Sequence, residues 1–163
     1  MRLLIPLFLY AKKILHRPMF YISAYFEQNR EEYYDRLLWI TEKNNWSGWI
    51  QFFLQAVITQ SQVNIRKARK ILSLYDHMKE RIPEITRSQF ATQTIEVLFN
   101  HPIFTTRTLK EQSTIPKTSI HRILQSLADA EVVKVLVPSS GRSPAVFLFP
   151  QLFKIAEEQE QIE

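Results

Sequence analysis

The sequence contains no cysteine and only two glycines among its 163 residues. Without cysteine, the chain has neither a disulfide framework nor a thiolate that could bind a metal or attack a substrate. With only Gly48 and Gly141, it cannot form a glycine-rich loop around a phosphate group. The four histidines, at positions 16, 77, 101 and 121, lack the spacing of a metal site. We therefore predict no metal site and no catalytic residues of these classes.

Long hydrophobic runs are also scarce. The apolar run over residues 3 to 11 is too short to span a bilayer. Lys12 and Lys13 close it, and no small-residue cleavage site of a secretory signal follows. We expect a buried core helix that starts at residue 2 without a cap, as in a chain cut from a longer one. We also expect a cytoplasmic protein without membrane contact.

Charge is in mild excess rather than strongly biased. The chain is 45% hydrophobic and 23% charged, the balance of a globular protein that can bury one ordinary core or two small ones. The net charge of +5 is compatible with an anionic partner but does not identify one. Carboxylates such as Glu31, Glu32 and Asp35 share one predicted helix face and are interpreted as solvated rather than catalytic.

Helical periodicity dominates residues 1 to 60. Tyr33 and Leu37 belong to the apolar stripe of a helix predicted over residues 27 to 40, with acidic side chains early, where the helix dipole favours them. Two asparagines, at positions 44 and 45, are predicted to end it. A further helix over residues 46 to 60 has an aromatic-rich apolar face. We expect these helices to pack together.

Residues 61 to 85 are predicted to form a basic connector helix. Between Arg66 and Arg81 the sequence has six basic and only two acidic side chains. Such a helix either contacts a DNA backbone or an acidic partner, or packs on one side as a solvated linker, and we favour the linker. Its near-heptad spacing also leaves a homodimer open. Pro83 is expected to stop the helix.

Residues 86 to 153 have the pattern of a winged helix. A helix over residues 88 to 100 precedes a short helix over residues 104 to 111 with a threonine cap. A second helix follows Pro116. Its apolar side chains recur at the spacing of one helix face: Ile120, Ile123, Leu124 and Leu127. The β-prone runs over residues 132 to 137 and 145 to 149 flank a turn-rich loop and predict a hairpin.

The polar face of the helix after Pro116 is the predicted DNA-binding surface, with the helix in the major groove and the wing at phosphates or the minor groove. The residues predicted to contact DNA are Lys117, Thr118, Ser119, His121, Arg122, Gln125 and, in the wing, Arg142. Residues 84 to 150 hold seven basic and five acidic side chains, a net charge of +2, which predicts few phosphate contacts and modest affinity. Protein interaction is the alternative, because winged helices also serve as protein-binding modules.

Residues 2 to 60 resemble a known family. The runs RLLIP at residues 2 to 6, RPMFYISAYFEQNREEYYDRL at 17 to 37 and NWSGWIQFFL at 45 to 54 are similar to the part of Fic-family (Fic/Doc) proteins that follows their signature motif. Members that transfer AMP to protein hydroxyls have HxFx(D/E)GNGRxxR immediately before such a run, and Arg2 matches its last arginine. Many of these proteins also resemble this chain in ending with a winged helix.

The rest of that motif is missing. In the family its histidine is the general base, its acidic residue holds a metal and its Gly-Asn-Gly loop grips phosphates, so a complete member uses ATP and Mg²⁺. Arg2 alone cannot position an anion against a nucleophile. The resemblance places Tyr33 and Tyr34 on the adenine side of the nucleotide pocket as a remnant of its wall, although packing in the helical core explains them better. We predict no adenylyltransferase (AMPylation) activity and no cofactor for this chain.

The predicted fold class is mainly α: a helical remnant of the C-terminal part of a Fic domain, and a winged helix-turn-helix domain with a small β-hairpin. Residues 154 to 163 are predicted to be an acidic tail that extends a last helix from Phe153. The predicted function is DNA binding by a truncated Fic-family protein, for transcription regulation or for targeting. The alternatives are a protein-interaction or autoregulatory module that acts with a motif-bearing Fic half or a protein target, and a truncated product without independent function.

Overall fold

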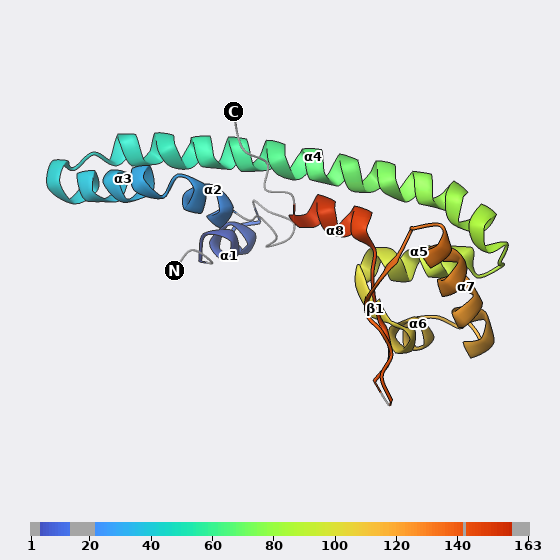
Figure 1. Ribbon diagram of the computed structural model, residues 1–163. Coiled ribbons are helices and arrows are strands. Elements are labelled where there is room, and N and C mark those ends of the chain that lie inside the picture. The colour runs from blue at the N-terminus through green and yellow to red at the C-terminus, as the bar shows by residue number, and fades with distance from the viewer. Residues whose placement is uncertain (1–3, 14–21, 142, 158–163) are drawn as a thin grey trace. The chain divides into compact units, whose positions relative to one another are not determined.

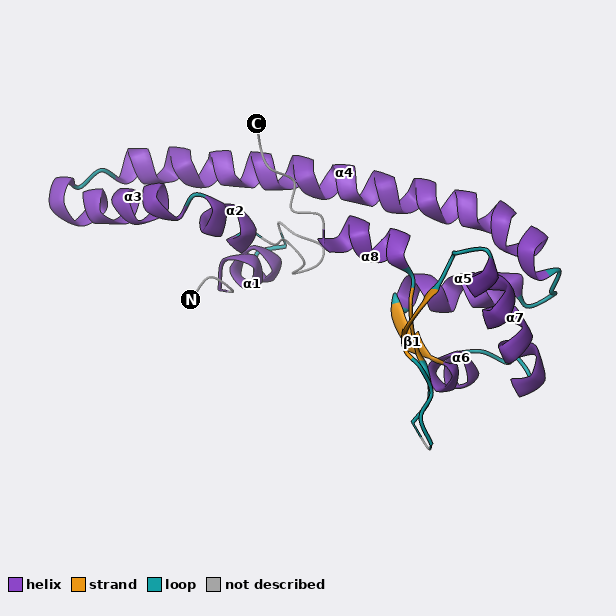
Figure 2. Ribbon diagram, viewed as in Figure 1, coloured by secondary structure: helices purple, strands orange, loops and turns teal. Residues whose placement is uncertain are grey.

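The computed structural model describes residues 4–13, 22–141 and 143–157 of the chain (Figure 1). Its described part is mainly helical, with one small three-stranded antiparallel sheet (Figure 2). The chain divides into two compact units, Met1–Arg66 and Lys67–Glu163. The prediction of a mainly α protein with a small β-hairpin is confirmed.

Unit 1 contains α1 (Leu4–Ala11), α2 (Ser23–Gln28), α3 (Arg30–Lys43) and the first part of α4 (Trp46–Thr86). The single helix predicted over residues 27 to 40 is wrong in one respect, because the chain breaks at Asn29. There the side-chain Nδ2 donates to the Tyr25 carbonyl at 2.9 Å, a local bond of the kind with which asparagine competes with regular helix. Residue 2 lies outside the described residues.

The core of unit 1 is aromatic. Phe26 is fully buried, with its ring centroid 5.9 Å from that of Phe52 on α4 and 5.0 Å from that of Tyr33 on α3. Ile22 and Ala56 complete the buried set with Tyr25. The expectation that the apolar helices pack together is confirmed for α2, α3 and α4. The N-terminal helix was expected to be buried, but Leu7, Phe8 and Tyr10 of α1 are 51%, 60% and 48% exposed.

α3 and α4 are joined by a tight connection at Asn44 and Asn45. Asn44 takes the left-handed conformation, φ 51° and ψ 33°, which ends α3 as predicted. Asn45 then caps α4, since its Oδ1 accepts from the Gly48 amide at 3.0 Å. A Cβ at Gly48 would lie 2.7 Å from Asn45 Nδ2, so a larger residue there would displace the capping side chain.

α4 corrects two predictions. The helix predicted over residues 46 to 60 and the connector over residues 61 to 85 are one continuous helix, and the boundary between the units falls inside it. Pro83 does not stop this helix, which ends at Thr86. Pro83 falls in the last turn, where its carbonyl still accepts from the Arg87 amide at 2.9 Å, and Arg87 ends the helix with a φ of 45°.

Unit 2 continues from α4 with α5 (Ala91–Asn100), β1 (Ile103–Thr105), α6 (Thr106–Gln112) and α7 (Lys117–Asp129). The chain then forms β2 (Lys134–Val137), β3 (Val146–Leu148) and α8 (Pro150–Glu157). The strand order is β1-β3-β2, and Phe147 of β3 pairs with Phe104 on one side and Val135 on the other. The predicted order of three helices followed by a hairpin is confirmed, with the short strand β1 added between α5 and α6.

Three boundaries in unit 2 differ from the prediction. Phe104 lies in β1 and not in a helix, because the strand pairs with β3, which is distant in sequence. α5 begins at Ala91 and not at residue 88, because the Ser88 hydroxyl accepts from the Phe90 amide and holds a turn there. α8 begins at Pro150, ahead of the predicted Phe153. Residues 158 to 163 of the predicted acidic tail lie outside the described residues.

The core of unit 2 lies between the helices and the sheet. The predicted apolar face of α7 is buried throughout, with Ile120, Ile123, Leu124 and Leu127 each at most 3% exposed. The other contributions come from α4, α5, β1, α6, β3 and α8 and the residue before α8: Met78, Ile82, Leu98, Phe104, Leu109, Phe147, Phe149 and Leu152 are among them. None of the described helices is both long enough and apolar enough to cross a membrane.

Candidate nucleic-acid interface

The turn between α6 and α7 is fixed to α5 by side chains. The Thr114 amide donates to Gln93 Oε1 at 3.1 Å, and Gln93 Nε2 donates to the Thr114 hydroxyl at 3.0 Å. Ile115, 3% exposed, anchors the turn in the core. At the far end of α7, Arg81 Nη2 on α4 donates to the Ala130 carbonyl at 3.2 Å. α7 is therefore held at both ends.

This placement presents the polar face of α7 to solvent. Of the six α7 residues predicted to contact DNA, five are exposed and Ser119 is half-buried; the exposed ones are Lys117, Thr118, His121, Arg122 and Gln125. Gln125 Nε2 donates to Asp129 Oδ1 at 2.8 Å, which brings a carboxylate to the end of the surface. The structure thus brings the six residues together on one helix.

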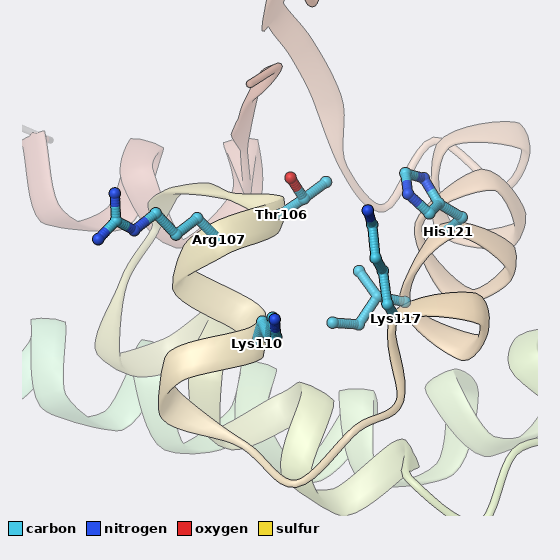
Figure 3. Close-up of a pocket in the computed structure, with 6 residues that line it drawn as sticks. Thr106, Arg107, Lys110, Lys117 and His121 are labelled. Atoms are coloured by element: carbon cyan, nitrogen blue, oxygen red, sulfur yellow. The ribbon is translucent and has the colours of Figure 1, made fainter. Parts of the chain in front are cut away.

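A groove of about 230 Å³ separates the first turns of α6 and α7 (Figure 3). It is lined by Thr106, Arg107, Lys110, Lys117, Ile120 and His121. In Figure 3, Lys117 and His121 approach from α7, while Lys110 and Thr106 lie on α6 across from them. The three α6 residues were not predicted as site residues. Thr106, Arg107 and Lys110 are polar residues close in sequence to Leu109, the buried residue of α6. This polar pattern around one apolar position is the sequence signal that could have identified them.

Charge in this groove is mostly unneutralised. Arg107 Nε donates to Glu111 Oε1 at 2.7 Å, and this hydrogen bond raises the pKa of the Arg107 side chain above its ordinary value. Within the described part of the chain, neither Lys110 nor Lys117 has a carboxylate within 4 Å. Two lysines with unpaired charge therefore face one groove, and an anion is the ligand they favour.

α6 owes its position to a reciprocal cap. The Thr105 hydroxyl accepts from the Thr108 amide at 3.1 Å, and the Thr108 hydroxyl accepts from the Thr105 amide at 3.2 Å. Because Thr105 is also the last residue of β1, paired with Val146, the cap joins the sheet directly to α6. The predicted threonine cap is thereby confirmed, and it places Thr106 and Arg107 at the mouth of the groove.

The wing consists of β2, β3 and their connecting loop. Ser140 and Ser143 exchange backbone hydrogen bonds of 2.9 and 3.2 Å, and Gly141 between them has a φ of 54°, a conformation that favours glycine. Lys134 at the base is exposed. Arg142, the predicted wing contact, lies outside the described residues. The rest of β2 is apolar and about half exposed: Val135, Leu136 and Val137.

Of the predicted nucleotide-binding remnant, the structure describes Tyr33 and Tyr34, whose ring centroids lie 5.4 Å apart. Tyr33 packs into the aromatic core, with its ring centroid 5.7 Å from that of Trp49. Tyr34 is 51% exposed, and the Arg30 guanidinium lies 5.8 Å from its ring centroid. Arg2 lies outside the described residues. Among the described histidines, aspartates and glutamates, no group of three or more is placed to hold a metal ion.

A scan of the sequence against models of known protein families finds no match.

Proposed function

We propose that unit 2 binds double-stranded DNA, with α7 in the major groove. The single observation that carries this proposal is the division of α7 into two faces. One face is buried in the core, and the other presents lysine, arginine, histidine, glutamine and threonine side chains to solvent. These are the side chains that donate to phosphates and to base edges in a groove wide enough for a helix.

In this proposal the side chains of α7 have different roles. Arg122 and Gln125, farther along the exposed face, are the candidates for base contacts, because both can form bidentate pairs with bases. Lys117 and Lys110, which flank the groove, supply phosphate contacts that fix the register without reading sequence. The two lysines therefore set affinity, and Arg122 with Gln125 sets preference.

The modest charge of the domain limits its affinity. A net charge of +2 over residues 84 to 150 is small for a nucleic-acid-binding surface. Few counterions are released when few phosphates are contacted, so affinity falls only gently with salt for one copy of the chain.

The test is fluorescence anisotropy with short labelled duplexes between about 50 and 200 mM salt, the range over which phosphate contacts are visible. The expected result is binding that weakens with salt, and Arg122→Ala loses the preference for one duplex over others. Lys154→Ala, which removes one exposed charge from α8, is the matched control and keeps it. Absence of binding at the lowest salt, or equal behaviour of the two variants, would refute the proposal.

Protein binding through the wing is the second candidate. It is favoured by the exposed apolar residues of β2, a strand that lies at an edge of the sheet.

Residues 2 to 60 resemble the C-terminal part of a Fic domain without its signature motif. We propose that the chain transfers no AMP by itself. If a separate, motif-bearing Fic half binds this chain, we propose that the chain regulates AMP transfer by that half.

A further inference from the structure

The first part of α4 is apolar on two opposite sides. Its buried side contacts the core of unit 1 through Phe52 and Ala56. On the other side, five large apolar side chains form what we call the outer stripe: Trp46, Ile50, Leu54, Ile58 and Ile65. With 3.6 residues per turn, positions 54 and 58 lie on the side of the helix roughly opposite to positions 52 and 56. Each side chain of the outer stripe is at least 50% exposed.

Within unit 1, nothing described covers this stripe. α2 and α3 lie along one side of the first part of α4 (Figure 1), and the aromatic core with Phe52 and Ala56 is formed there. An apolar helix face is ordinarily buried against another element. An exposed apolar surface of this length indicates an interaction site rather than scattered surface residues.

The residues around the stripe are uncharged. No Asp, Glu, Lys or Arg occurs from Asn44 to Ile65, so the stripe is flanked by serine, threonine, asparagine and glutamine side chains. When a surface meets an identical copy of itself, an excess of one charge sign on it is repelled by the same excess on the partner, and residues near the twofold axis meet their own copies. A neutral surface has no such cost, and its glutamines can hydrogen-bond to each other. The absence of charge therefore suits a second copy of this chain better than an acidic or basic partner.

The area is also compatible with a dimer. The stripe extends over 20 residues, about 28 Å of helix. Its half-exposed side chains offer on the order of 500 Å² per copy, so two copies bury about 1,000 Å² before the polar rim is counted, close to what a specific interface needs. Trp46 at one end is of the residue type that most often dominates interface energies.

We propose that this chain forms a homodimer through the outer stripe of α4, with the uncharged polar residues as its rim. The proposal is independent of DNA binding, because all the residues that carry it lie in unit 1.

The test is sedimentation equilibrium of the full chain from low to high micromolar concentration. The expected result is a monomer–dimer equilibrium that hardly changes with salt, because the interface is uncharged. Leu54→Glu would bury an unpaired carboxylate and raise the dimer dissociation constant at least about a hundredfold. Leu38→Glu is the matched control: Leu38 is 50% exposed against 53% for Leu54, but it lies on α3, and this variant still dimerises. Far-UV circular dichroism checks that both variants are folded.

Because the chain has no cysteine, cross-linking gives a second measurement. Single cysteines at positions 46, 54 and 65 form an intermolecular disulfide only where the two Cα atoms approach within about 7 Å. Cross-linking at all three indicates parallel helices, and cross-linking near the middle alone indicates antiparallel helices. A protein that sediments as a monomer throughout, a Leu54→Glu variant that dimerises as well as Leu38→Glu, or no cross-link at any position would overturn the proposal.

Discussion

The reciprocal cap at the start of α6 gives the sharpest stability prediction. Thr105→Ala removes the hydroxyl that accepts from the Thr108 amide at 3.1 Å, and leaves the Thr108 hydroxyl in place. Loss of an N-cap of this kind costs about 1 kcal/mol of folding free energy. For a unit of this size, that lowers the melting temperature by about 4 to 8 °C. Thr105→Ser keeps the accepting oxygen and should lower it much less.

The assay can separate the two units. All three tryptophans, Trp39, Trp46 and Trp49, lie in unit 1, so tryptophan fluorescence follows that unit, while far-UV circular dichroism follows the helices of both. We expect Thr105→Ala to lower the midpoint of the circular-dichroism transition and to leave the fluorescence midpoint in place. If Thr105→Ser were as damaging as Thr105→Ala, the side-chain methyl and not the cap would be responsible, and the reasoning would be wrong.

Three further predictions concern the groove, the core and the missing motif. Lys110→Ala and Lys117→Ala should each reduce the steepness of the plot of log affinity against log salt by about 0.9, because each variant loses one phosphate contact. Lys154→Ala is the control and should leave the slope unchanged. Equal slopes in all three variants would exclude the groove from the interface. Phe26→Ala should lower the free energy of unfolding of unit 1 by about 3 to 5 kcal/mol. The midpoint of urea unfolding, followed by tryptophan fluorescence, should therefore move to a lower urea concentration. An unshifted midpoint would contradict the aromatic core. The purified chain should transfer no labelled AMP to itself or to other proteins, and robust transfer would show that the motif is not needed.

What could be predicted from the sequence depended on local periodicity. The buried face of α7 was predicted correctly because Ile120, Ile123, Leu124 and Leu127 repeat at helical spacing within one segment. The threonine cap and the end of α3 at Asn44 were also predicted, since both depend on the conformational preferences of single residues.

What could not be predicted depended on contacts between distant segments. β1 has only three residues and exists because Phe104 pairs with Phe147, more than forty positions along the chain. The groove residues Thr106, Arg107 and Lys110 lie on a different helix from Lys117, and their proximity is set by the packing of α6 on α7. Pro83 suggested a helix end, but tertiary packing of Met78 and Ile82 continues α4 past it.

The connection at Asn44 and Asn45 limits which changes in chain length unit 1 tolerates. Its backbone is fully specified: Asn44 is left-handed, the Asn45 amide donates to the Trp39 carbonyl at 3.1 Å, and Asn45 caps the next helix. One added residue would separate the left-handed turn at Asn44 from the cap at Asn45, so this connection would no longer hold α4 at a fixed position against α3. Insertions there would therefore scramble the core of unit 1, whereas the exposed loop at residues 138 to 141 offers a place where added residues disturb little.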